Sequence, residues 1–226
     1  MIEKPNQSIE RSALQHDPGF VHRFEPGTTN RTLLLLHGTG GDENDLINLG
    51  REIDPGAALL SPRGKVLENG APRFFRRLAE GVFDEADVVQ RAHELADFVK
   101  TATETYGIDR KELVAIGYSN GANIAAAMML LGLATFPYAI LLRPMVPLSH
   151  LESRPNLNGM QALLLAGKLD PIARLPIVEA LGDLFRQAGA EVQLRTGQSG
   201  HELTSADVAA ARNWLNERPS SPENPL

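Results

Sequence analysis

The chain has 226 residues, of which 42% are hydrophobic, and this is enough to bury a sizeable core in one domain. Its formal net charge is −6, so the chain lacks the basic surface that neutralises phosphates, and nucleic acid is not an expected partner. It contains no cysteine, which excludes disulfides, a thiolate nucleophile and cysteine-bound zinc.

The two ends of the chain differ from the middle in composition. Residues 1–19 are polar and lack the apolar segment of a secretory signal, and residues 218–226 hold three prolines and two serines. We therefore expect a flexible arm at 1–19, a single domain at 20–217 and a disordered tail at 218–226. No apolar run approaches the length of a membrane span, and the expected location is cytoplasmic.

Apolar runs of strand length recur along the chain. A weak one, Phe20–Phe24, follows Pro18 and Gly19 and is a candidate edge strand. Helical patterns lie between most of the stronger runs, and this alternation predicts an α/β fold with a mostly parallel sheet covered on both faces. The stronger runs are Thr32–Leu36, Ala57–Leu60, Leu113–Ile116, Tyr138–Leu142, Gln161–Ala166 and Glu191–Arg195.

Apolar residues at spacings of three and four predict helices between these strands. One runs over Asp84–Tyr106, and another over Arg174–Ala188, where Gly189 follows as a C-terminal cap. A last helix begins at Thr204, whose spacing to Asp207 is typical of a capping pair.

Two longer irregular stretches, Ser61–Gly81 and Arg143–Asn158, each follow the C-terminal end of a predicted strand. In open parallel sheets, ligands bind in the crevice outside those ends. We expect the two stretches to form pocket walls, with plain surface connections as the alternative.

One pentapeptide, Gly117-Tyr118-Ser119-Asn120-Gly121, stands between a strand pattern and a helix pattern. A nucleophile on a sharp strand-to-helix turn needs flanking residues without Cβ, because strand and helix approach each other closely there. Ser119 is therefore the candidate nucleophile. Such a pentapeptide also arises by chance, so the chain must supply the other groups that a serine needs.

A serine hydroxyl becomes a nucleophile when a histidine removes its proton and an acid orients that histidine. His201 lies in a loop after the last predicted strand, and Asp170 lies in the turn that follows Gln161–Ala166. Both loops leave the C-terminal edge of the sheet, and the order serine, acid, histidine is the one that such folds use. Either residue could instead be a simple helix cap.

The same chemistry requires backbone amides that stabilise negative charge on the substrate oxygen. The amide of Asn120 and that of Thr39, in the loop Leu36–Gly41, are the expected donors, with Gly40 as the alternative for Thr39. Although Gly38-Thr39-Gly40 begins a dinucleotide-binding pattern, the sixth position is Glu43, and no phosphate-binding P-loop or complete calcium loop is present.

Six short segments of the chain, spread over residues from about 31 to 217, together resemble the phospholipase/carboxylesterase branch of the α/β-hydrolase superfamily. The resemblance implies a compact α/β-hydrolase fold without a large lid domain, with Ser119 as nucleophile, His201 as base, Asp170 as acid, and Thr39 and Asn120 as oxyanion donors. It also implies hydrolysis of short esters or thioesters without a metal or other cofactor. The segments are Leu36-His37-Gly38-Thr39-Gly40-Gly41, Ser61-Pro62-Arg63-Gly64, Arg73-Phe74-Phe75-Arg76-Arg77, Gly117-Tyr118-Ser119-Asn120-Gly121-Ala122, Gly167-Lys168-Leu169-Asp170-Pro171 and Gly200-His201-Glu202-Leu203.

Four apolar residues of the irregular stretches are candidates for the substrate pocket: Phe74, Phe75, Met145 and Val146. Their character suits a pocket that is lined mostly by hydrophobic side chains, although packing in the core under a loop explains it equally well.

The expected function is a serine carboxylesterase that hydrolyses small to medium esters through an acyl-enzyme. A thioesterase or lysophospholipase would use the same groups, and acyl-protein thioesterases usually carry leucine where this chain has Thr39. A non-catalytic ligand-binding protein of the same fold is the alternative from another class. The expected partner is a small ester, and a homodimer is compatible with the sequence.

Overall fold

The computed structural model describes residues 19–151 and 153–218. The arm predicted at 1–19 and the tail predicted at 218–226 fall outside these ranges, except for residues 19 and 218.

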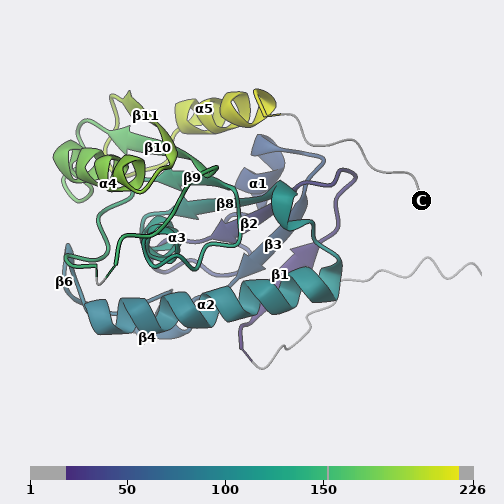
Figure 1. The fold of residues 1–226 in the computed structure, drawn as a ribbon, viewed down its shortest axis with the longest axis horizontal. Helices are drawn as coiled ribbons and strands as arrows, with labels where there is room; N and C mark the ends of the chain where they lie inside the picture. The colour runs from purple at the N-terminus through teal and green to yellow at the C-terminus, as the bar shows by residue number, and fades with distance from the viewer. Residues whose placement is uncertain (1–18, 152, 219–226) are drawn as a thin grey trace, which may run out of the picture.

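A seven-stranded sheet forms the centre of the molecule (Figure 1). Its strands are β1 (His22–Glu25), β2 (Thr32–Leu36), β3 (Ala58–Pro62), β8 (Leu113–Tyr118), β9 (Tyr138–Leu142), β10 (Gln161–Gly167) and β11 (Glu191–Gly197). They lie in the order β1-β3-β2-β8-β9-β10-β11. Only the edge strand β1 is antiparallel to its neighbour, so the predicted mostly parallel sheet of the α/β class is confirmed.

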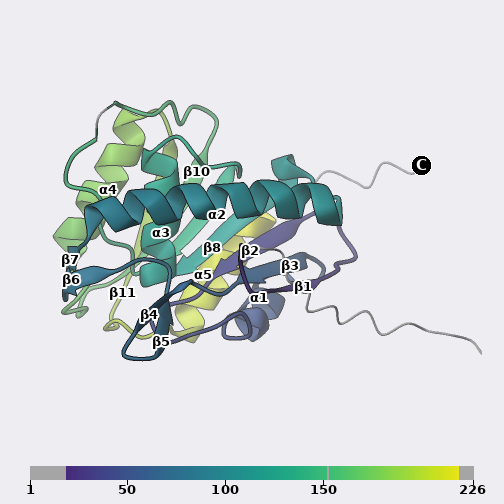
Figure 2. The same cartoon turned by 90° about the horizontal axis from the view of Figure 1, so that it is seen from below.

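Helices cover both faces of this sheet (Figures 1 and 2). One face carries α2 (Glu85–Tyr106), α3 (Asn120–Leu130) and α4 (Leu175–Gln187), and the other carries α1 (Ile47–Ile53) and α5 (Ser205–Asn216). The run Leu33–Leu36 shows why: Leu34 and Leu36 pack into the core of the first face, while Leu33 and Leu35 pack into that of the second. A strand buried on both sides has no polar face, which is why its sequence reads as a continuous apolar run.

The ends of the helices agree with their sequence signals. Asp84 caps α2 by accepting a hydrogen bond from the Asp87 amide, and Gly189, with φ of 100°, follows the end of α4. Thr204 and Asp207 form the two reciprocal hydrogen bonds of a capping box at the start of α5. A short 3₁₀ helix, η1 (Arg110–Glu112), leads into β8.

The stretch predicted as irregular at Ser61–Gly81 contains one short hairpin and the first strand of a second. In the first, β4 (Val66–Glu68) pairs with β5 (Ala71–Arg73), and in the second, β6 (Arg77–Ala79) pairs with β7 (Val82–Phe83). The turn of the first is Asn69-Gly70, and both residues have positive φ, 51° and 85°. An Asn-Gly pair at a two-residue turn suits the twist of a hairpin and is a strong sequence signal for one.

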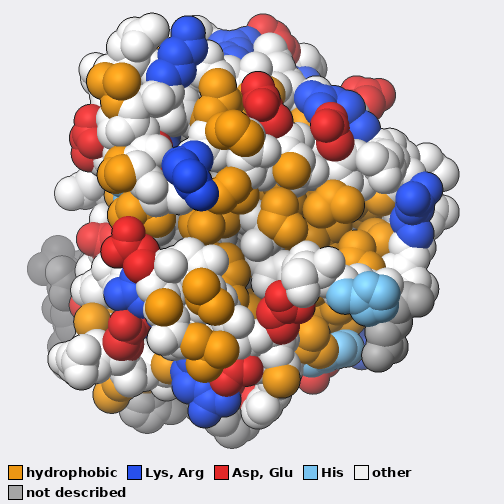
Figure 3. All heavy atoms as spheres, turned by 90° about the vertical axis from the view of Figure 1, so that its left-hand side faces the viewer, with side chains coloured by type: hydrophobic (Ala, Val, Ile, Leu, Met, Phe, Trp, Pro, Cys, Tyr) orange, Lys and Arg blue, Asp and Glu red, His pale blue; other side chains and the backbone are white. Residues whose placement is uncertain are grey.

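The helix α4 and the hairpin that contains β6 lie at the end of the molecule where α2 begins (Figure 1). Viewed from that side, the surface shows hydrophobic side chains over a broad area, with basic and acidic side chains among them (Figure 3). None of the helices within residues 19–151 and 153–218 has the length and hydropathy that a membrane crossing requires.

Candidate active site

Ser119 occupies the turn between β8 and α3 with φ of 51° and ψ of −112°. A serine with positive φ is strained, so the surrounding structure must hold it there. A Cβ at Gly117 would lie 2.5 Å from the Gly121 carbonyl oxygen, and a Cβ at Gly121 would overlap the Leu36 carbonyl. The two glycines therefore let strand, turn and helix approach closely enough to project the Ser119 side chain from the C-terminal edge of the sheet.

Three side chains selected from the sequence lie in one hydrogen-bonded line. His201 Nε2 is 2.8 Å from Ser119 Oγ, and His201 Nδ1 is 2.8 Å from Asp170 Oδ2. The other Asp170 oxygen accepts the amides of Ile172 and Ala173 at 2.8 and 2.9 Å. Asp170 therefore closes its own turn and orients His201, and it does not cap α4, whose N-cap position is Arg174.

The two residues that carry the expected oxyanion donors line the same cavity as Ser119. The Asn120 amide is at the first position of α3, where no intrahelical acceptor precedes it. The Thr39 amide forms no hydrogen bond with any described residue. The Gly40 amide donates to the Pro72 carbonyl at 2.9 Å and is therefore already engaged. Of the two candidates in this loop, Thr39 is the one with a free donor.

His37 holds the loop that leads to Thr39. Its Nε2 accepts the Gly64 amide at 2.9 Å, so the proton lies on Nδ1, which donates to the Gly38 carbonyl at 2.7 Å. The side chain is fully buried, and burial lowers the pKa of His37 because the charged imidazolium loses its hydration. A neutral His37 is thus part of the loop's structure, and no sequence signal separated it from the other histidines.

Arg143 holds the loop at residues 200–202, the histidine loop, in place by hydrogen bonds. The sequence did not suggest this role. The Arg143 guanidinium is fully buried and pairs with Asp207 at 2.7 and 3.0 Å. It also donates to the carbonyls of Gly200 and Glu202, at 3.0 and 2.8 Å, on either side of His201. Burial opposes ionisation of Asp207, but the hydrogen bonds from Arg143 and Thr204, together with the charge of Arg143, outweigh it and lower the pKa of that carboxyl.

Tyr118 supports the same loop from the strand that carries Ser119. Its hydroxyl donates to the His201 carbonyl at 3.0 Å. Burial raises the pKa of the Tyr118 phenol, so the phenol keeps the proton that this hydrogen bond requires. Three successive carbonyls around His201 are therefore held by Arg143 and Tyr118.

Two asparagines of α3 anchor the stretches on either side of Ser119. The Asn120 side-chain oxygen accepts the Phe74 amide at 2.7 Å, and that of Asn123 accepts the Met145 amide at 2.7 Å. Both side chains are buried in a helix whose other residues are mostly alanine, methionine and further apolar residues. A buried polar group requires a partner, so isolated asparagines in such a helix were a signal for these anchors.

A cavity of about 210 Å³ opens at Ser119 and His201, and Thr39, Asn120 and Met145 contribute to its wall. Both stretches predicted as pocket walls reach this cavity. No cluster of three or more histidine, aspartate and glutamate side chains that could hold a metal occurs in the described part of the chain.

The structure differs from the prediction for three of the four apolar pocket residues. Phe74 and Phe75 are 2% and 0% exposed and belong to the core, because the hydrogen bond to α3 draws this segment inward. Val146 lines a second, larger cavity. Met145 does line the cavity at Ser119, and Phe83 of β7, which the sequence did not single out, lies there with it.

The chain is similar to known proteins over most of its length. The family model for phospholipase/carboxylesterase matches residues 25–218. The chain belongs to this family. The resemblance seen in the sequence motifs is thus confirmed, and the protein is a hydrolase of the carboxylesterase-like type.

Relatives in this family match nearly the whole chain. MhqD of Bacillus subtilis (strain 168) is 48% identical over 196 residues, which cover 87% of this chain and 98% of that protein. The carboxylesterase of Bacillus cereus is 44% identical, with a TM-score of 0.84 over 88% of this chain and 94% of its own. The carboxylesterase from Mesorhizobium loti is 35% identical, with a TM-score of 0.87 over 92% and 99%.

Proposed function

We propose that the protein is a serine carboxylesterase that hydrolyses small to medium esters through an acyl-enzyme. The observation that carries the proposal is the line of two 2.8 Å hydrogen bonds from Asp170 through His201 to Ser119. Nucleophile, base and orienting acid are the three groups that this chemistry requires, within the distances it requires.

In the proposed reaction, Ser119 Oγ attacks the ester carbonyl while His201 Nε2 accepts its proton. The negative charge that develops on the carbonyl oxygen is stabilised by the Thr39 and Asn120 amides. The alcohol leaves with the proton from His201, and a water molecule, activated in the same way, releases the acid. Asp170 keeps the other proton of His201 on Nδ1 and stabilises the imidazolium as it forms.

The dimensions of the site support the size of substrate. The cavity at Ser119 is about 210 Å³ and adjoins one of about 270 Å³, so together they lie in the lower part of the roughly 300–1,000 Å³ that is usual for drug-sized ligands. A thioesterase or lysophospholipase would use the same groups, and a direct comparison of substrates decides among them. A purely ligand-binding role has no need for a serine held at positive φ, which favours the enzymatic function. The cytoplasmic location and the homodimer stay predictions.

The Ser119→Ala variant tests the proposal. It should abolish the burst of alcohol release from an activated ester and lower kcat by at least about 10⁴-fold. Thermal unfolding checks that the variant keeps the fold. Ester turnover at the wild-type rate by a folded Ser119→Ala protein would refute the proposed function.

A further inference from the structure

The cavity at Ser119 has a cationic wall. Two arginines, Arg73 and Arg77, lie among the described residues that line it, and no aspartate or glutamate does. This contrasts with the chain as a whole, whose formal net charge is −6. Basic side chains are thus concentrated where the ester would bind.

Arg73 is the inner of the two and is committed to the protein. Its side chain is 3% exposed and donates to Thr39 Oγ1 at 2.6 Å and to the Phe75 carbonyl at 3.1 Å. It also pairs with Glu68 at 3.2 Å. Burial, and then the charge of Arg77, lower the pKa of Arg73.

Arg77 is the outer arginine and keeps free donors. Its Nε is 3.0 and 3.2 Å from the two carboxylate oxygens of Glu68. Its two terminal nitrogens form no hydrogen bond with any residue that the structure describes. The side chain is 32% exposed, so a ligand in the cavity can reach it.

One carboxylate therefore serves two guanidinium groups. Glu68 neutralises one of the two charges, so the two arginines and Glu68 together carry one net positive charge. The carboxylate of Asp170, on the far side of His201, is fully buried and does not line the cavity. The space continues into an adjoining cavity of about 270 Å³, whose wall holds one acid, Glu80, and one base, Arg174, and so adds no net charge. A planar guanidinium with free N–H groups binds a carboxylate through two hydrogen bonds.

We infer that the preferred substrates are esters that carry a carboxylate, and that Arg77 binds this carboxylate while Ser119 attacks the ester carbonyl. The inference rests on the proposed esterase function and names its substrate class. The competing explanation is that Arg77 only ties the second hairpin to Glu68.

The test compares anionic esters with neutral esters of the same shape. The monoethyl esters of succinic, glutaric and adipic acids place a carboxylate at increasing distance on the acyl side, and acetyl esters of short hydroxy acids place it on the alcohol side. The corresponding ester amides are neutral controls. We expect kcat/KM for at least one anionic ester to exceed that of its amide about tenfold, an effect of the size of one charge-assisted hydrogen bond.

Variants then assign the preference to one side chain. Arg77→Gln should bring the ratio of anionic to neutral kcat/KM close to one. Arg76→Gln is the matched control, since Arg76 is 61% exposed, pairs with Asp84 and does not line the cavity, and it should keep the wild-type ratio. Equal hydrolysis of ester and amide by the wild type, or an equal loss for both in Arg77→Gln, would overturn the inference and leave the esterase function intact.

A binding measurement separates this inference from the proposed function. Calorimetric titration of the Ser119→Ala variant with succinate, glutarate and adipate requires no turnover. If the wild type hydrolyses no ester but a dicarboxylate binds and Arg77→Gln weakens that binding, the esterase function fails while the carboxylate site stands. If no dicarboxylate binds and no anionic ester is preferred, the carboxylate site is refuted.

Discussion

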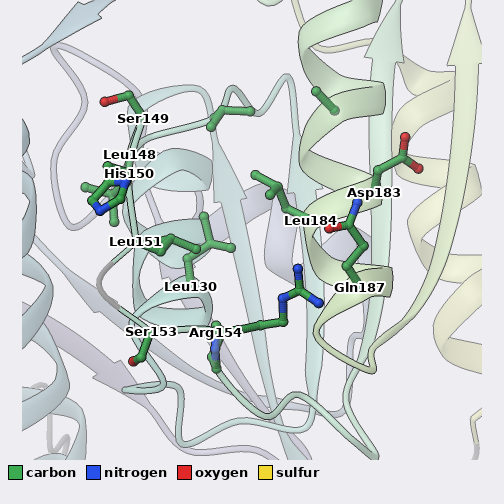
Figure 4. Close-up of a pocket in the computed structure, with 13 residues that line it drawn as sticks. Leu130, Leu148, Ser149, His150, Leu151, Ser153, Arg154, Asp183, Leu184 and Gln187 are labelled. Carbon is green, nitrogen blue, oxygen red and sulfur yellow. The ribbon is translucent and has the colours of Figure 1, made fainter.

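Two cavities lie on either side of Met145 and Val146, and they differ in chemistry as much as in size. The smaller, about 210 Å³, contains Ser119, His201 and two arginines. The larger, about 690 Å³, is lined by leucines of α3, α4 and the loop between β9 and β10 (Figure 4). These are Leu130, Leu148, Leu151 and Leu184.

The larger cavity lacks the groups that the proposed chemistry requires. The smaller cavity lies at the C-terminal ends of the strands, next to a strained turn, and has free backbone donors. The larger one has His150, Arg154 and Asp183 on its wall, but none of its described serines is hydrogen-bonded to a histidine. We therefore expect changes at the smaller cavity to affect catalysis and equivalent changes at the larger one to leave it unaffected.

The largest effect is expected from Asp170→Asn. An amide at this position can donate to His201 Nδ1 and so favours the tautomer whose Nε2 carries a proton and cannot accept that of Ser119. We expect kcat to fall by about 10⁴-fold with little change in KM. Asp183→Asn, at the larger cavity, is the matched control and should stay within about twofold of wild type. Comparable losses in both variants would contradict the distinction between the cavities.

Arg143→Met should be the most destabilising change near the site. It leaves Asp207 buried without its cation, and breaking a buried ion pair in this way costs about 3–5 kcal/mol. Urea unfolding measures the change in the free energy of unfolding. Arg186→Met removes an exposed pair with Asp183 and should cost less than about 1 kcal/mol. A small effect of Arg143→Met would mean that the histidine loop does not depend on the guanidinium.

His37 should make stability depend on pH. Its pKa is lowered by burial, so the unfolded chain binds more protons than the folded one once the pH drops below about 6.5. Stability from this residue is thus complete above that pH and falls as the pH decreases, by at most about 1.4 kcal/mol per unit.

Urea unfolding from pH 7.5 to 5.5 tests this slope. The His37→Asn variant should lack part of the slope, while His93→Asn, at an exposed position of α2, should retain it. Parallel curves for wild type and His37→Asn would show that the buried imidazole does not contribute.

The smallest effect is expected at the larger cavity itself. Leu184→Ala removes part of a half-buried side chain and should reduce the free energy of unfolding by about 1 kcal/mol. Its kcat/KM for short esters should remain within about twofold of wild type. A tenfold loss of kcat/KM with an unchanged fold would assign the larger cavity to substrate binding.

The sequence was most informative where one physical rule determines the outcome. Strands buried on both faces read as unbroken apolar runs, and the placement of Ser119, Asp170 and His201 at one edge follows from where the strands of a parallel sheet end. The helix caps at Asp84 and Thr204 could be predicted because each forms its hydrogen bond with a residue only three positions further along the chain. These features could therefore be predicted without the structure.

The sequence was less informative where contacts between residues that are distant along the chain determine the structure. Phe74 and Phe75 could face the core or the pocket, and the hydrogen bond to Asn120, 46 residues away, draws their segment inward. Arg143 is one arginine among many in the sequence, and its partner Asp207 is 64 residues away. The hairpin at Asn69-Gly70, in contrast, has a local sequence signal in its two-residue Asn-Gly turn.

Arg143 also joins distant parts of the chain energetically. It sits at the end of β9, it donates to the Leu165 carbonyl of β10, and it holds Asp207 of α5 together with both sides of His201. The histidine loop consequently cannot open by itself without also exposing buried charges in the sheet and in α5. Local unfolding at this loop should be as costly as global unfolding, so enzyme activity and the fluorescence of the buried Trp214 should be lost at the same urea concentration.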